Sequence, residues 1–191
     1  MPEEEQAPLR AGQLLVATPA LVDPNFEHAV VLLLDLDESG ALGVVLNRPS
    51  PVPVEQILEG WGDLASNPQV LFHGGPVSTE SALGVATLRP GQAEDPVGFR
   101  RLFDDTGIVD LDTPTELLAG AVTGMRIFAG YAGWGSEQLE AEVEEGSWYV
   151  VPAVPADLVT ADPEGLWMRV LRRQPGELAW VSTRPLDPTL N

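Results

Sequence analysis

A lone arginine at the end of an apolar strand candidate is the residue of this chain best suited to hold a ligand. Asn47 and Arg48 directly follow the apolar stretch Ala41–Leu46. A guanidinium group presents a fork of N–H donors that can bind a carboxylate or a phosphate through two hydrogen bonds. The alternative is a structural ion pair with Glu55 or Glu80, which the sequence favours.

Two glycine-rich segments could bring backbone amides close to such a ligand. Gly74-Gly75-Pro76 follows a strand candidate at Val70–His73. Its N–H groups could cradle an anion, although a tight turn is the interpretation we favour. Gly130–Gly135 follows a second strand candidate at Met125–Ala129, and we predict a turn there that leads into an acidic helix.

Two side chains near the second glycine segment have alternative roles. Ser136 is predicted to cap the acidic helix that follows it. Trp134 lies between Gly133 and Gly135, so it is either a core residue or a platform on which a ligand stacks. We favour the core position.

These segments are predicted to meet in space and form one ligand pocket. Each of them follows a predicted strand, and ligands often bind where strand ends meet loops. The ligand would be a small anion or an acidic peptide that Arg48 binds. The candidate ligand-binding residues are Asn47, Arg48, Gly74, Gly75, Gly133, Trp134 and Ser136.

Several kinds of catalytic site are excluded by residue type. The chain contains neither cysteine nor lysine, which excludes thiolate metal sites, cysteine nucleophiles and Schiff-base lysines. His28 and His73 are the only histidines, and Glu27 would point to the opposite strand face from His28. No G-x-S-x-G pattern surrounds Ser78 or Ser81. We therefore predict no catalytic residue, no metal site and no cofactor.

The charge of the chain argues against polyanionic partners. Asp and Glu number 29 against ten basic residues, all of them arginine, which gives a net charge of −19. Such a field repels nucleic acids and anionic membranes, so we expect no direct contact with either. The start of the chain is acidic and no apolar run is long enough to span a bilayer, so a cytoplasmic location is expected.

The clearest structural element is a hairpin. Ala29–Leu36 and Ala41–Leu46 are almost entirely apolar, and Asp37–Gly40 between them has the composition of a tight turn. Strands without polar alternation are typical of the centre of a sheet that is covered on both faces. By contrast, Arg126 and Phe128 alternate with more buried residue types, as in a half-buried strand.

The remaining elements are predicted from periodicity, caps and turn residues. Pro49, Pro51 and Pro53 are expected to end the strand before them. Val70–His73 is expected to pair antiparallel with Ala82–Leu88. Further strands are predicted at Gln13–Ala17, Gly107–Leu111, Trp148–Val151 and Leu178–Ser182, and helices at Val54–Trp61, Thr113–Val122, Ser136–Glu145 and from Asp162, the last with Leu166, Trp167, Val170 and Leu171 on one face.

This order of elements indicates an α+β fold. We predict a single compact domain at residues 9–183, with a mixed, mainly antiparallel sheet flanked by helices. Residues 1–8 and 184–191 are predicted to be N-terminal and C-terminal tails.

Three stretches resemble the YqgE/AlgH family of bacterial proteins. They are TPALVDPNFEHAVVLLLDLDESGALGVVLNRP within Gly12–Pro49, FHGGPVSTESALGV at Phe72–Val85, and GYAGWGSEQLEAEVEEGSWYVVP at Gly130–Pro152. The resemblance implies one compact α+β domain. It also implies a largely undefined role, because one branch of the family is associated with regulation of transcription, including exopolysaccharide production, without an established enzymatic activity.

Two classes of function remain open from the sequence. The first is a non-catalytic regulatory or interaction protein that acts through a protein partner or a small ligand. The second is a hydrolase or transferase built from carboxylates, which the many acidic residues permit but no spacing specifies. The lack of a catalytic constellation favours the first.

Overall fold

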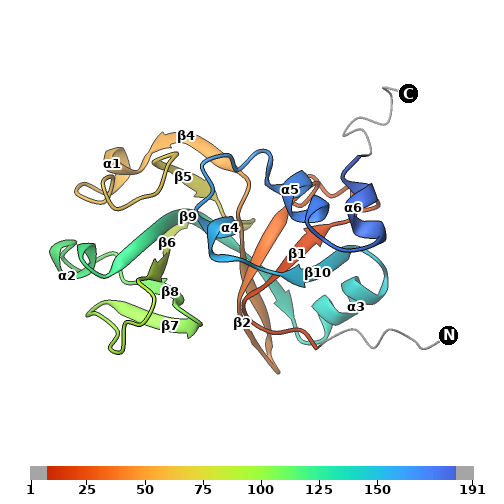
Figure 1. Cartoon of the computed structure of the whole chain (residues 1–191), viewed down its shortest axis with the longest axis horizontal. Coiled ribbons are helices and arrows are strands. Elements are labelled where there is room, and N and C mark those ends of the chain that lie inside the picture. Colours follow the sequence, from red (N-terminus) through yellow and green to blue (C-terminus); the bar gives the residue numbers. More distant parts are fainter. Residues whose placement is uncertain (1–7, 184–191) are drawn as a thin grey trace.

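The computed structural model describes residues 8–183, which fold around one curled sheet of ten strands (Figure 1). In chain order the strands are β1 (Gln13–Ala17), β2 (Val30–Asp37), β3 (Gly40–Val45), β4 (Pro49–Pro53), β5 (Val70–His73), β6 (Val77–Leu88), β7 (Phe99–Phe103), β8 (Thr106–Val109), β9 (Val122–Gly135) and β10 (Trp148–Pro152). Neighbouring strands follow the order β10-β1-β2-β3-β9-β6-β8-β7, and the β4–β5 pair joins this path through β9. The β5–β9 pair is parallel and the other described pairs are antiparallel. The predicted single α+β domain is confirmed.

Short helices surround the sheet. They are α1 (Val54–Ile57), α2 (Glu116–Ala119), α3 (Gln138–Glu144), α4 (Pro155–Leu158), α5 (Leu166–Arg172) and α6 (Glu177–Val181). Helices α1 and α2 lie at one end of the molecule, α3, α5 and α6 lie at the other, and α4 lies between (Figure 1). No helix within residues 8–183 has the length and apolar character needed to cross a bilayer. Apart from Pro8, the two predicted tails fall outside the described residues.

Strand β9 connects the two halves of the sheet. Its residues 122–131 pair with β6, and its residues 132–135 pair with β3. The prediction of a turn at Gly130–Gly135 is therefore wrong. Gly130 has a φ of 75°, and it lets the strand bend and continue into the second half.

The central hairpin is covered on both faces, as predicted. Val30, Leu32 and Leu34 contribute to one buried cluster, which also contains the apolar face of α5. Val31 and Leu33 contribute to a second cluster, on the opposite face, together with Leu139 of α3. This double coverage explains why β2 shows no polar alternation over its first five residues.

Helix α5 is confirmed with its predicted apolar face. Leu166, Trp167, Val170 and Leu171 are buried, a spacing that places them on one side of a helix. The Trp167 indole also donates a hydrogen bond of 2.9 Å to the carbonyl of Ala17 in β1. These contacts hold α5 against the first half of the sheet.

Local sequence signals were wrong where long-range pairing decided the structure. Phe72 of β5 lies opposite Phe128 of β9, and Leu83 of β6 lies opposite the same residue from the other side. Strand β9 therefore separates β5 from its predicted partner at Ala82–Leu88. β3 ends at Val45, before the prolines, as predicted. Pro49–Pro53 then forms a strand that was not predicted, β4, which pairs with β5 alone, and an edge strand tolerates proline.

Two further predictions of local structure were also wrong, one of an element type and one of a helix start. The segment predicted as a strand at Leu178–Ser182 lies largely in α6, where Leu178 and Val181 both contact the central cluster, as residues three apart on a helix do. The helix predicted to begin at Thr113 begins instead at Glu116 as α2, and its N-cap, Thr115, makes no side-chain capping bond. Thr113 is instead buried against Gly98.

Candidate functional site

The three segments of the predicted pocket do meet in space. The His73 amide donates a hydrogen bond of 2.8 Å to the carbonyl of Arg48, and the Val45 amide donates one of 2.9 Å to the carbonyl of Gly74. Gly75 packs directly on Tyr131 of β9. The convergence predicted from the sequence is thus present.

Protein backbone fills the space around the two glycines of the first turn. A Cβ atom on Gly74 would lie 2.2 Å from the carbonyl oxygen of Gly130, and one on Gly75 would lie 2.2 Å from that of Tyr131. Such distances are far below contact, so glycine is required for the chain segments to approach each other. Both glycines serve the close packing of backbone, and ligand binding at them stays a prediction.

Asn47 and Arg48 bind the loop that precedes β2. The Arg48 guanidinium donates hydrogen bonds of 2.9 and 2.8 Å to the carbonyls of Pro24 and Glu27. Asn47 accepts a hydrogen bond from the Val30 amide and donates one to the carbonyl of His28. Burial lowers the pKa of Arg48, although the nearby carboxylates of the same loop oppose this shift. Arg48 is therefore already engaged by the protein itself.

The favoured ion pair of Arg48 is not formed. Among the described residues, Arg48 forms no salt bridge with Glu55 or Glu80. Glu55 instead accepts hydrogen bonds from the amides of Gly60 and Gly62. Backbone carbonyls, which the sequence cannot place, replace the predicted carboxylate partner.

Trp134 occupies the core position that we favoured. It is 6% exposed, and its indole N–H donates a hydrogen bond of 2.9 Å to Glu142 of α3. The same carboxylate oxygen accepts the indole N–H of Trp148 at 2.9 Å. Gly133 and Ser136 are exposed. Glu137, not Ser136, is the N-cap residue of α3, so that capping prediction is wrong.

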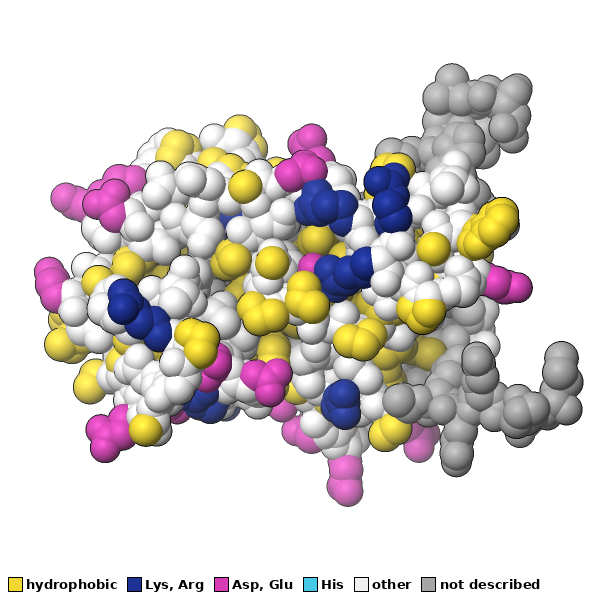
Figure 2. Space-filling model, viewed as in Figure 1, with side chains coloured by type: hydrophobic (Ala, Val, Ile, Leu, Met, Phe, Trp, Pro, Cys, Tyr) yellow, Lys and Arg dark blue, Asp and Glu magenta, His cyan; other side chains and the backbone are white. Residues whose placement is uncertain are grey.

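Outside this region, the arginines concentrate at a cleft between α4 and α5. The cleft has a volume of about 390 Å³. It is lined by Val154, Ala156, Asp157, Thr160, Leu166, Arg169, Arg172 and Arg173. On the face shown in Figure 2, dark blue side chains gather over these helices beside a group of apolar ones. This is our candidate functional site, and we call it the arginine cleft.

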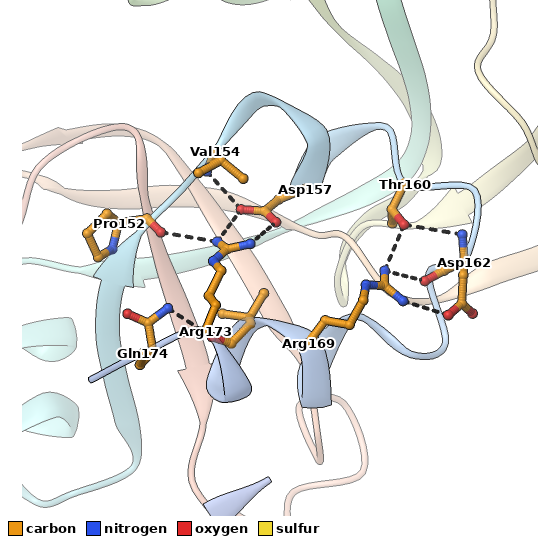
Figure 3. Close-up of polar contacts among 9 residues, drawn as sticks. Pro152, Val154, Asp157, Thr160, Asp162, Arg169, Arg173 and Gln174 are labelled. Carbon is orange, nitrogen blue, oxygen red and sulfur yellow. Dashed lines mark hydrogen bonds and ion pairs between the residues drawn. The ribbon is translucent and has the colours of Figure 1, made fainter. Parts of the chain in front are cut away.

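One wall of the arginine cleft is a two-point ion pair. Both terminal nitrogens of Arg173 donate hydrogen bonds of 2.6 Å to the two carboxylate oxygens of Asp157 (Figure 3). The side chain of Asp157 is 5% exposed, and it also accepts a hydrogen bond from the Val154 amide at the start of α4. Hydrogen bonding to Asp157 raises the pKa of Arg173. The pair fixes the distance between α4 and the end of α5.

The second wall is a smaller network around Arg169. Its guanidinium forms an ion pair with Asp162 and donates a hydrogen bond of 2.7 Å to the Thr160 hydroxyl (Figure 3). It also donates to the carbonyl of Asp162. These contacts orient Arg169 and close the loop between α4 and α5.

Arg172 is the remaining cation of the arginine cleft. It is exposed, and within residues 8–183 it has no ion pair. Three guanidinium groups therefore face two carboxylates in a chain whose net charge is −19. With buried Leu166 beside them, they can bind a small anion that has an apolar part.

The sequence contained part of the signal for this site. The sequence groups three arginines near the C-terminal end of a predicted helix: Arg169, Arg172 and Arg173. Their favourable interaction with the helix dipole explains this grouping without any ligand. Asp157 and Thr160 come from the segment before the helix, and nothing in their spacing marked them as partners. Only the folded arrangement brings them together.

A buried arginine of the central strand holds the α4–α5 segment that forms the arginine cleft. Arg126 of β9 is 1% exposed, although alternation predicted a half-buried strand with Arg126 on its less buried face. It donates hydrogen bonds to the carbonyls of Leu158 and Thr160, and to those of Ser66 and Pro68. Burial lowers its pKa to about 10, so it stays charged at neutral pH. The α4–α5 segment is thus fastened to the central strand.

The described residues hold no group of three His, Cys, Asp or Glu side chains that could bind a metal ion. His28 packs edge-on against the ring of Trp167, with ring centroids 4.9 Å apart. It therefore serves packing in this structure.

Comparison with known proteins places the whole domain in one group. The AlgH-like family model matches residues 14–179. A UPF0301 protein of Streptomyces avermitilis is 62% identical over 182 residues, which cover 94% of each chain. One from Mycobacterium tuberculosis is 43% identical over 195 residues, covering 100% of this chain and 96% of the other.

Solved structures agree with the sequence comparison. The crystal structure of a Corynebacterium diphtheriae protein is similar with a TM-score of 0.88 at 34% identity, covering 94% of this chain and 95% of the other. The solution structure of the AlgH protein from Pseudomonas aeruginosa is similar with a TM-score of 0.66 at 29% identity, covering 91% and 93%. The residues matched by the family model, 14–179, include the segment that carries the arginine cleft.

Proposed function

The chain belongs to the AlgH-like family, and on this premise we propose that it is a non-catalytic regulatory protein that binds a small anion in its arginine cleft. The observation that carries the proposal is the gathering of three of the ten arginines at one cleft of a strongly acidic chain. A cytoplasmic location, and action through a protein partner, belong to the same proposal.

The cleft suits a ligand of modest size. A volume of about 390 Å³ lies within the range of small-molecule sites, roughly 300–1,000 Å³. Arg172 supplies a cation without an ion pair among the described residues, while Arg169 and Arg173 are held in place by their aspartates. Because those aspartates partly neutralise the cleft, we expect moderate affinity and strong dependence on salt.

Calorimetric titration with pyrophosphate and with citrate at low salt tests the proposal. The Arg172→Gln variant should bind the better probe about fivefold more weakly, the effect of losing one exposed ion pair. Arg100→Gln is the matched control, because Arg100 is an exposed arginine on β7 outside the cleft. If both variants bound the probe equally weakly, the effect would come from net charge alone, and the proposal that the arginine cleft binds the anion would be refuted. Conversion of a probe into product would instead favour the carboxylate-based hydrolase or transferase.

The partner is tested separately, by capture from a native lysate with and without the probe that binds. The wild-type chain should retain a protein whose recovery changes when the probe is added, and the Arg172→Gln chain should lose that response. If the recovery of the captured protein did not change when the probe was added, partner binding would not depend on the arginine cleft. Direct binding of nucleic acid is not part of the proposal, since a net charge of −19 opposes it.

A further inference from the structure

A second cavity lies on the other side of α4 from the arginine cleft. Its volume is about 160 Å³, and its walls include Leu32 of β2, Phe103 of β7 and Leu158 of α4. Val154 and Asp157 line both spaces, so α4 forms a wall between them. In Figure 1, α4 lies between the two halves of the sheet. Leu32 and Phe103 in the cavity lining come from one half each. We call this space the interlobe cavity.

A buried hydroxyl without a partner faces the interlobe cavity. Thr87 is 7% exposed and lines the cavity, and its Oγ1 atom has no hydrogen-bond partner within residues 8–183. Residues two apart on a strand share a face, and Val85 belongs to the cluster that contains Leu32 and Leu158. The Thr87 side chain therefore points to the same side as the cavity walls.

An unpaired buried hydroxyl is unusual and calls for a partner. Burial of a hydroxyl without a hydrogen bond is costly, and most buried polar side-chain atoms in proteins have a partner. The interlobe cavity provides the space for one. An apolar cavity of about 150 Å³ is large enough for a benzene-sized molecule.

The charged residues around the interlobe cavity favour a positively charged ligand. Asp104, Asp105 and Asp157 line it, and its lining contains no arginine or histidine. Asp105 pairs with Arg101, and Asp157 pairs with Arg173. Asp104 has no ion pair in the described part of the chain, so its carboxylate is available to a cation. The unpaired carboxylate of Asp104 would repel an anion here.

We propose that the interlobe cavity is a binding site for a small organic amine. Its apolar part fills the space between Leu32, Phe103 and Leu158, and its nitrogen donates a hydrogen bond to Thr87 Oγ1. The aspartates at the cavity favour the ammonium form over a neutral or anionic head group. This site takes the opposite charge from the arginine cleft and is independent of the proposed function.

Three probes of matching shape test this site: benzylamine, benzyl alcohol and benzoate. They differ in the charge of the head group, and each is titrated into the isotopically labelled full chain and followed by amide chemical shifts. We expect benzylamine to shift the amides of Thr87, Asp104 and Leu158 and to bind at least tenfold more tightly than benzoate, because of the aspartates. Equal binding of benzylamine and benzoate would overturn the proposal, and so would no binding of benzylamine at millimolar concentration.

Substitutions at Thr87 identify the hydrogen bond. Thr87→Val keeps the shape of the side chain and removes the hydroxyl, so benzylamine should bind about fivefold more weakly while the fold is kept. Thr87→Ser keeps the hydroxyl and should retain most of the affinity. Unchanged affinity in Thr87→Val would overturn the assigned contact. Arg172→Gln should leave benzylamine binding unaltered, which separates this site from the arginine cleft.

Discussion

Replacing Arg126 by methionine should destabilise the protein more than any surface change. Arg126 is 1% exposed and donates hydrogen bonds to four backbone carbonyls, those of Ser66, Pro68, Leu158 and Thr160. Its guanidinium carbon also lies 4.2 Å from the centre of the Phe72 ring. Methionine approximates the length of the aliphatic stem but supplies no donor. Three of the four carbonyls would lose their donor, whereas the Pro68 carbonyl also accepts a hydrogen bond of 2.8 Å from the Val70 amide.

The size of the effect follows from two opposing contributions. At about 2 kcal/mol for each of the three buried carbonyls left without a donor, the loss is about 6 kcal/mol. Against this, the variant no longer buries a charge. Burial lowers the Arg126 pKa from 12.5 to about 10, which corresponds to about 3 kcal/mol. The net destabilisation expected for Arg126→Met is therefore about 3 kcal/mol, at the lower end of the range for removing one member of a buried polar network.

Urea unfolding of both proteins measures this difference, and hydrogen exchange shows where it acts. The free energy of unfolding should fall by about 3 kcal/mol, and the amides of the α4–α5 segment should exchange faster than those of α3. Arg100→Met, an exposed position on β7, serves as the control and should change stability by no more than about 0.5 kcal/mol. A loss below about 1 kcal/mol in Arg126→Met would refute the argument, because it would mean that other groups satisfy the carbonyls.

Three further predictions concern charge. Asp157→Asn should lower the free energy of unfolding by about 1–2 kcal/mol in urea melts, less than a fully buried pair, because the Arg173 side chain is 33% exposed; an unchanged midpoint would show that the pair adds nothing. The pKa of Glu55 is lowered by hydrogen bonds from Gly60 and Gly62, so the stability it contributes is present above its unfolded pKa and is lost as the pH falls through the folded value; NMR titration should find the Glu55 pKa below 4.5, and a higher value would contradict this. Thermal stability should rise from low to moderate NaCl, since salt screens repulsion among 29 carboxylates over roughly 8 Å at 0.15 M; a flat midpoint would indicate that the charges are already paired.

Elements defined by local pattern were predictable from the sequence. The β2–β3 hairpin follows from two apolar runs around Asp37–Gly40, and the buried face of α5 follows from helical spacing. In both cases the residues that decide the structure are close together in the chain. The same holds for Trp134, whose core position was favoured from residue type.

Features that depend on distant partners were not predictable in the same way. Gly130–Gly135 has the composition of a turn, yet pairing with β3 and β6 keeps it extended. Alternation placed Arg126 on the less buried face of a half-buried strand, because nothing in the sequence reveals that the loops at Ser66 and Thr160 cover that face of β9. The arginine cleft needed the same information, since Asp157 meets Arg173 only after α4 folds back on α5.

Because β9 belongs to both halves of the sheet, the molecule has no modular boundary. A fragment that ends before Val122 leaves β3 and β6 without their shared neighbour, so we expect that neither half folds as a separate unit. A deletion of one residue near Tyr131 would turn Trp134 away from the cluster that contains Trp148, because a shift of one position reverses the side chains of a strand. Engineering of this scaffold should therefore change its loops and leave the length of β9 intact.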